Sequence, residues 1–172
     1  YLPFAVTDPR AFNHPLEWVK ALFPLLRRVP SATETIINES ATVDRIAATD
    51  IWQPVIEPDQ EPWLDLTLII DESSSMILWR RMVGELKGVL QHYGIFRDVK
   101  VWRLGKTSEQ GIYLRSRLRF HQPQELLDHQ GRRLILLVSD FVDELWKQPE
   151  ILLIIEKWTQ SNWVAGLQML PE

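Results

Sequence analysis

Leu64-Asp-Leu-Thr-Leu-Ile-Ile70 is an almost continuous apolar run, and Asp71-Glu-Ser-Ser-Ser75 follows it directly. A short apolar run of this kind predicts a β-strand that is covered on both faces. The residues from Ser75 to Tyr93 then repeat apolar side chains at helical spacing and stop at Gly94, which predicts a long amphipathic helix. A buried strand that leads into such a helix is typical of an α/β fold.

The residues beyond this helix alternate between strand and helix patterns. Buried strands are predicted at 99–104 and 133–138, a half-exposed antiparallel strand at 112–120, a helix at 149–159 and a last strand at 164–170. We therefore predict a Rossmann-like three-layer α/β sandwich. Its central sheet should be mainly parallel, with the half-exposed strand as one antiparallel edge.

Residues 1–60 have a different pattern, which predicts a helical and extended arm ahead of the α/β domain. Apolar residues recur at helical spacing over 16–26, and Ser40 is placed to cap a second, shorter helix. The segment Glu57-Pro-Asp-Gln-Glu-Pro62 is polar and carries two prolines, so we expect a linker there. The α/β domain should then span residues 61–172.

The composition narrows the classes of function. Hydrophobic residues make up 45% of the chain and charged residues 24%, as in globular proteins, and the net charge of −4 comes without a basic stripe. A nucleic-acid partner is therefore not expected, and the apolar runs are too short for a membrane span. The absence of Cys excludes disulfides and thiolate metal sites and fits the cytoplasm. The chain begins with Tyr1 and not Met, which indicates a piece of a longer polypeptide.

Two of the predicted strands end in the same way, with an aspartate and hydroxyl side chains. Asp71 follows the first strand and precedes Ser73 and Ser75, and Ser139-Asp140 follows the strand at 133–138. Parallel sheets bind ligands beyond the carboxyl ends of their strands, where the strand order reverses. If the two strands are neighbours, these side chains converge there. Two carboxylates and two hydroxyls form a hard oxygen site, which suits Mg²⁺, with Mn²⁺ or Ca²⁺ as alternatives.

The spacing Asp71-x-Ser73-x-Ser75, between an apolar strand and a long helix, resembles the metal-ion-dependent adhesion site of von Willebrand factor A (vWA) domains. Leu137-Val-Ser-Asp140 is similar to the second acidic segment of that family. The resemblance implies that Asp71, Ser73, Ser75 and Asp140 are the ion ligands. A full site of the family also takes a Thr from the loop before the fourth strand, whereas residues 119–131 contain neither Thr nor Ser. The expected site is therefore incomplete.

More narrowly, the whole chain resembles bacterial vWA-like modules of large multidomain signalling and conflict-system proteins. Ala41-Thr-Val-Asp-Arg-Ile46 and Phe96-Arg-Asp-Val-Lys-Val-Trp-Arg-Leu104 carry this resemblance. It implies a non-catalytic adaptor part of a larger protein, which binds a protein partner or another domain of its own polypeptide, with a bridging Mg²⁺. Glu72, Asp143 and Trp146 lie around the predicted crevice, and we expect them to contact that partner.

Other interpretations of the same residues stay open. Asp71, Ser73 and Ser75 could cap the following helix without binding a ligand, and Asp140 could be a turn residue at the end of its strand. Acidic strand ends could also hold Mg²⁺ for a phosphoryl-transfer enzyme or a nuclease, although the sequence places no Lys or Arg clamp near them. In a further alternative, the domain is a structural spacer with a vestigial metal site.

Overall fold

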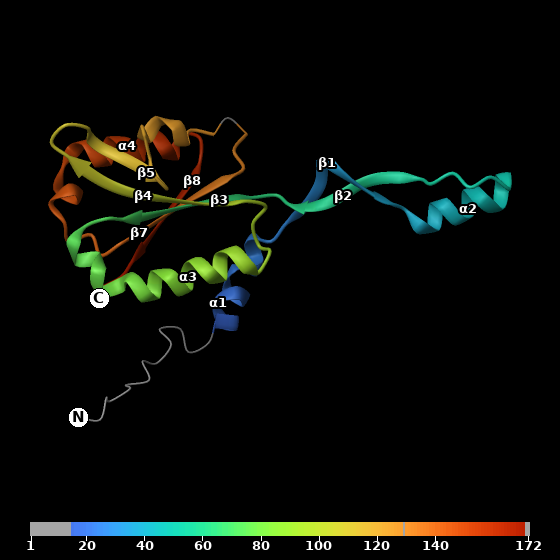
Figure 1. Cartoon of the computed structure of the whole chain (residues 1–172), viewed down its shortest axis with the longest axis horizontal. Coiled ribbons are helices and arrows are strands. Elements are labelled where there is room, and N and C mark those ends of the chain that lie inside the picture. Colours follow the sequence, from blue (N-terminus) through green and yellow to red (C-terminus); the bar gives the residue numbers. More distant parts are fainter. Residues whose placement is uncertain (1–14, 129, 171–172) are drawn as a thin grey trace, which may run out of the picture.

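The computed structural model describes residues 15–128 and 130–170 (Figure 1). The first fourteen residues of the predicted arm lie outside the described residues. The helices and strands are, in chain order, α1 (Pro15–Leu22), β1 (Arg28–Ile37), α2 (Glu39–Thr49), β2 (Ile56–Pro62), β3 (Asp65–Asp71), α3 (Arg80–His92), β4 (Val99–Thr107), β5 (Gly111–Ser116), β6 (Arg119–His121), β7 (Arg133–Ser139), α4 (Pro149–Thr159) and β8 (Trp163–Gln168). Short 3₁₀ turns connect some of them: η1 (Phe23–Leu25), η2 (Ser74–Trp79), η3 (Pro123–Leu126) and η4 (Glu144–Lys147).

The main sheet of the described chain has six strands in the order β6-β5-β4-β3-β7-β8. β3 pairs in parallel with both β4 and β7, and β8 pairs in parallel with β7. The prediction of an α/β fold with a mainly parallel sheet is therefore confirmed. The predicted antiparallel direction of the segment 112–120 at one edge of the sheet is confirmed, but the prediction of a single strand is wrong, because the segment forms two antiparallel strands, β5 and β6. Arg117, with a φ of 55°, lies in the turn between them.

The apolar runs of the central strands pack against helices on both faces of the sheet. In β3, Leu66 and Leu68 belong to the core under α3, whereas Ile69 belongs to the core under α4. Figure 1 shows α3 on one side of the sheet and α4 on the other, so the body has three layers. This burial on two sides explains why residues 64–70 are apolar almost throughout.

The α-helix predicted from Ser75 begins later than expected. The residues directly after the β3 loop form the 3₁₀ turn η2, and the α-helix starts at Arg80. Met76 of this turn is buried and anchors the loop in the core. The predicted end is confirmed, since α3 finishes at His92 and Gly94 has a φ of 63°, a conformation that favours glycine.

The segment predicted as a linker is a β-strand. β2 pairs antiparallel with β1 in a separate two-stranded sheet. Its prolines are tolerated because a strand of a two-stranded sheet has one edge without a partner, which needs no N–H donors. The N-cap of α2 also differs from the prediction. Asn38, and not Ser40, accepts the backbone N–H of Ala41, at 2.9 Å.

β1, α2 and β2 form an arm that projects away from the three-layer body (Figure 1). Hydrogen bonds and ion pairs hold its base. The indole N–H of Trp63 donates to the carbonyl of Leu25 at 3.0 Å. Arg97, in the loop before β4, pairs with Asp65 at 2.6 Å and with Glu61 at 3.3 Å.

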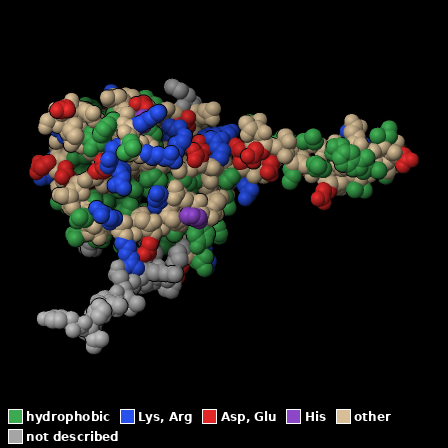
Figure 2. Space-filling view, viewed as in Figure 1, with side chains coloured by type: hydrophobic (Ala, Val, Ile, Leu, Met, Phe, Trp, Pro, Cys, Tyr) green, Lys and Arg blue, Asp and Glu red, His purple; other side chains and the backbone are tan. Residues whose placement is uncertain are grey.

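The far end of this arm is apolar and open to solvent. Its exposed side chains include Val43, Ile51 and Trp52, the last of which is 73% exposed. Figure 2 shows hydrophobic side chains gathered on the outer part of the arm. A two-stranded ribbon builds no core of its own, so the arm has no interior into which these side chains could turn.

Candidate functional site

The carboxyl ends of β3 and β7 meet at the point where the strand order reverses. From β3 the chain crosses through α3 to β4, and from β7 it crosses through α4 to β8 on the opposite side. Ligand sites of open α/β sheets lie at such a point. The structure confirms that the two strands are neighbours. Asp71 and Asp140, which end and follow them, are both buried, with 4% exposure each.

Asp71 is tied into the fold through both of its carboxylate oxygens. Its Oδ1 accepts the backbone N–H of Ser73 at 2.8 Å. Its Oδ2 accepts the hydroxyl of Ser139 at 2.6 Å and the indole N–H of Trp146 at 2.8 Å. One buried carboxylate therefore fastens the loop after β3 to the end of β7 and to the turn η4, and the three donors satisfy its charge.

The aspartates after β7 hold the backbone of their own loop. Asp140 accepts the N–H of Val142 at 3.2 Å, and Asp143 accepts the N–H of Leu145 at 2.9 Å, where it caps η4. Asp140 thus has the strand-end turn role that was the alternative to ion ligation. A contact of Asp143 with a partner stays a prediction.

The two serines of the motif lie together, but Ser73 does not cap the following turn through its side chain. Their hydroxyl oxygens are 3.1 Å apart, so Ser73 and Ser75 bond each other. Ser73 is the N-cap residue of η2, yet its side chain makes no capping hydrogen bond. The capping role considered for Ser73 is therefore wrong. The bond between the two hydroxyls lies within the loop after β3, and ion ligation by Ser73 and Ser75 stays a prediction.

Trp146 is half-buried, and its polar edge points inward. Its ring packs edge-on against Phe141, with ring centroids 4.7 Å apart and an interplanar angle of 65°. Its indole N–H donates a hydrogen bond to Asp71. Trp146 therefore holds its loop in place, and a direct contact with a partner stays a prediction.

The described residues do not fit a resident divalent ion in this arrangement. Within residues 15–128 and 130–170, no group of three or more His, Cys, Asp or Glu side chains is placed to hold a metal. The Asp71 oxygens face N–H and O–H donors, and an indole N–H has no acceptor with which to bind a cation. The stretch that lacks the family's Thr supplies no hydroxyl side chain either. Mg²⁺ binding stays a prediction that needs a rearranged Trp146.

Glu72, expected at the rim of the crevice, faces the neighbouring strands β4 and β5. Its carboxylate pairs with Arg115 and, at 3.7 Å, with Arg103, and it accepts the hydroxyl of Tyr113 at 3.3 Å. Gly105 permits this approach because a Cβ there would lie 2.6 Å from the Tyr113 hydroxyl oxygen. Burial and the negative charge of Glu72 raise the pKa of Tyr113 above its ordinary value.

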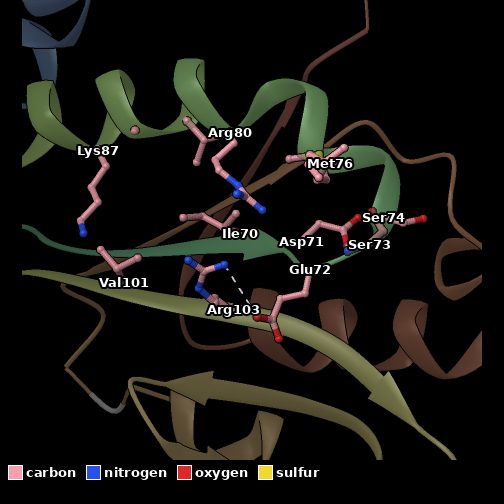
Figure 3. Close-up of a pocket in the computed structure, with 13 residues that line it drawn as sticks. Ile70, Asp71, Glu72, Ser73, Ser74, Met76, Arg80, Lys87, Val101 and Arg103 are labelled. Carbon is pink, nitrogen blue, oxygen red and sulfur yellow. Dashed lines mark hydrogen bonds and ion pairs between the residues drawn. The ribbon is translucent and has the colours of Figure 1, made fainter.

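A cleft of about 570 Å³ opens beside Asp71, between α3 and the strands β3 and β4 (Figure 3). Arg80 and Lys87 from α3 and Arg103 from β4 line it. The structure therefore brings Lys and Arg side chains near the acidic strand ends, where the sequence alone placed no such clamp. The sequence carries a signal for two of them, because positions 80, 84 and 87 share one face of a helix.

The loops after β3 and β7 also present apolar side chains to solvent. Leu78 is 82% exposed, Ile77 is 61% exposed and Val142 is 54% exposed. Sequence reasoning missed them, because a search for apolar residues at helical spacing selects the buried stripe and passes over apolar residues between its members. The carboxyl edge of the sheet therefore combines internally bonded polar groups with an apolar outer surface.

No protein-family model and no curated protein matches this chain. The resemblance to vWA domains therefore rests on the motif residues and on their placement after β3 and β7. Among the described residues, none of the helices has the length and apolar character needed to cross a membrane.

Proposed function

We propose that this chain is a non-catalytic protein-interaction module of the vWA-like type, which binds its partner directly at the carboxyl edge of the sheet. One observation supports the proposal. Polar side chains at the ends of β3 and β7 form hydrogen bonds with each other within the protein, as Asp71 does with Ser139 and Trp146. The loops after these strands expose Ile77, Leu78 and Val142. An apolar surface with a polar rim is the kind of surface that a protein partner covers.

The same observation weighs against a catalytic role. Catalysis needs an acid, a base or a nucleophile that is free to reach a substrate. Asp71 accepts hydrogen bonds on both oxygens. The hydroxyls of Ser73 and Ser75 bond each other, and neither is bonded to a base among the described residues. We therefore assign Asp71 the role of a structural acceptor, with a bridging Mg²⁺ as the alternative.

The proposed partner is a protein, either a separate chain or another domain of the same polypeptide, within a cytoplasmic signalling or conflict system. The motif resemblance supports the kind of system, and the absence of Cys supports the compartment. Nucleic acid is not proposed, since the net charge is −4.

Photo-crosslinking from Leu78, in cells that make the full polypeptide, tests the proposal. A photoreactive amino acid at this position should crosslink to one defined peptide, and mass spectrometry then tells whether that peptide belongs to another chain or to another domain. Leu118 is the matched control. It is 90% exposed and lies in the turn between β5 and β6, away from the loops after β3 and β7. The proposal fails if Leu78 gives no crosslink, or if Leu118 gives the same one.

A phosphoryl-transfer enzyme is the second candidate, and one observation favours it: Arg80, Lys87 and Arg103 line the cleft beside Asp71. Its test is hydrolysis of p-nitrophenyl phosphate in the presence of Mg²⁺. We expect no turnover above the uncatalysed rate. Turnover that Asp71→Asn abolishes would favour the enzyme over the interaction module.

A further inference from the structure

The cleft between α3 and the strands β3 and β4 contains positive charges that the fold leaves uncompensated. Its charged lining residues are Asp71, Glu72, Arg80, Lys87 and Arg103. Asp71 accepts hydrogen bonds from Ser73, Ser139 and Trp146, and Glu72 pairs with Arg115 on the neighbouring strand β5. Within the described part of the chain, Arg80 and Lys87 have no ion-pair partner. The charged groups that are free to contact a ligand, Arg80 and Lys87, are therefore positive.

Two guanidinium groups reach into this cleft from opposite walls. Arg80 extends from α3 and Arg103 from β4, and Figure 3 shows both side chains ending in the space around Ile70. Arg103 has Glu72 at 3.7 Å as its carboxylate partner. Like charges that share a cleft repel each other, and an anion between them removes this repulsion. Two planar guanidinium groups suit a phosphate group, which each of them can bond through two N–H donors.

Apart from Ser73 and Ser74, the uncharged side chains that line the cleft are apolar. Ile70 and Val101 form its floor, and nothing lies within 4 Å of the place where a Cβ of Gly84 would be. Lys87 lies seven residues after Arg80 on the same helix, which is about 10 Å along its axis. A volume of about 570 Å³ is within the usual range of small-molecule sites. The cleft therefore offers an anion site, an apolar floor and a second positive end.

We propose that this cleft binds a small organic phosphate. The phosphate group lies between Arg80 and Arg103, and the apolar part of the molecule covers Ile70 and Val101 beside Gly84. Lys87 contacts the far end of the ligand. Ile77 lines this cleft and also belongs to the exposed apolar surface, whereas Leu78 and Val142 do not line the cleft. The proposed phosphate contacts with Arg80 and Arg103 do not include that surface, so the proposal does not depend on the docking of a protein.

Titration of the protein with phenyl phosphate, followed by the backbone amide resonance of Gly84 in NMR spectra, tests the proposal. We expect a saturable shift of that resonance and tighter binding than for inorganic phosphate, which lacks an apolar part. Arg80→Gln and Arg103→Gln should each weaken the binding of phenyl phosphate at least about tenfold, because each removes a charge-assisted contact. Arg119→Gln is the matched control, since it removes the same charge on the edge strand β6.

Several results would overturn the proposal. The first is a wild-type protein in which phenyl phosphate causes no saturable shift. The second is equal affinity in the wild type, Arg80→Gln and Arg103→Gln. A third is tighter binding of a tetraglutamate peptide than of phenyl phosphate, which would assign the cleft to an acidic protein segment. The two arginine variants each replace an exposed side chain, so their folding is checked by the circular dichroism spectrum.

Discussion

The indole N–H of Trp146 is one of three donors to the buried carboxylate of Asp71. Trp146→Phe keeps an aromatic ring beside Phe141 but leaves the Asp71 Oδ2 with Ser139 as its donor. The loss of a hydrogen bond to a carboxylate costs about 1.5–3 kcal/mol. We expect the free energy of unfolding to fall by about this amount in urea titrations followed by circular dichroism.

Trp163→Phe is the control for this substitution. Trp163 is 64% exposed on the edge strand β8, so the same change in ring size should alter the free energy of unfolding by less than about 0.5 kcal/mol. Equal losses in the two variants would mean that the hydrogen bond to Asp71 contributes nothing beyond the contact area of the ring.

Tyr113 should titrate above the ordinary pH range of tyrosine, because burial and the Glu72 charge raise its pKa. A group with a raised pKa in the folded state stabilises the fold below its unfolded pKa, and this contribution disappears as the pH rises through the folded pKa. Stability should therefore fall above about pH 10. NMR titration of the tyrosine Cζ signals, assigned with Tyr113→Phe, measures the pKa directly.

Glu72→Gln separates the two causes of this shift. The variant removes the negative charge that opposes the tyrosinate while Tyr113 stays in the same place, so the pKa of Tyr113 should decrease toward its ordinary value. An unchanged pKa in this variant would show that burial alone raises it and that the bond between Glu72 and Tyr113 is absent in solution.

Local sequence patterns predicted the helices and strands in the central part of the fold. They failed where an element forms through contacts with residues far away in the sequence. The apolar runs at 64–70 and 133–138 are β3 and β7, and the predicted helix at 149–159 is α4. The polar segment with two prolines predicts a linker, because the pairing of β2 with β1 is not visible in its sequence. The turn between β5 and β6 was missed because Arg117 adopts a positive φ that usually signals Gly or Asn.

The same limit applies to the candidate site: the local sequence shows its residue types but not the contacts between distant residues. The residue types around Asp71 and Asp140 followed from the sequence, whereas the adjacency of their strands was a condition of the expected site that the structure fulfils. The hydrogen-bond donors of Asp71 could not be predicted from the sequence, because one of them, Trp146, lies 75 positions further along the chain. The ligand set was therefore predictable as a set of residues, whereas its internal hydrogen bonds depend on how the loop after β7 folds back.

The projecting arm should be dispensable for the stability of the body. Thr35 pairs with Pro58, so a two-residue Gly-Gly turn can replace residues 36–57 and close the shortened ribbon. The base contacts of Trp63 and Arg97 remain. Because the removed residues pack mainly within the arm, we expect the body to keep its Tm within a few degrees in thermal unfolding followed by near-ultraviolet circular dichroism.

Arg97→Gln provides the comparison for this deletion, because it leaves the arm whole and removes the ion pairs at its base. We expect it to lower the Tm more than the deletion does. A deletion that lowers the Tm more than Arg97→Gln would show that the distal arm packs against the body in solution.

In the whole molecule, the two proposed binding sites lie at different parts of the central sheet. The small-molecule cleft lies on the α3 face, the docking surface lies at the carboxyl edge, and the arm carries further exposed apolar residues away from both. Asp71 lies at the meeting point of the first two, since it lines the cleft and holds the loops that form the docking surface. Direct docking at this edge requires that Asp71 act as a hydrogen-bond acceptor and not as an ion ligand.

The indole N–H resonance of Trp146, assigned with Trp146→Phe, reports on this requirement directly. If Asp71 accepts this N–H as in the structure, the resonance exchanges slowly with water and does not move when millimolar Mg²⁺ is added. A saturable shift with Mg²⁺ that Asp71→Asn abolishes would contradict direct docking. It would show that the motif around Asp71 opens to hold an ion.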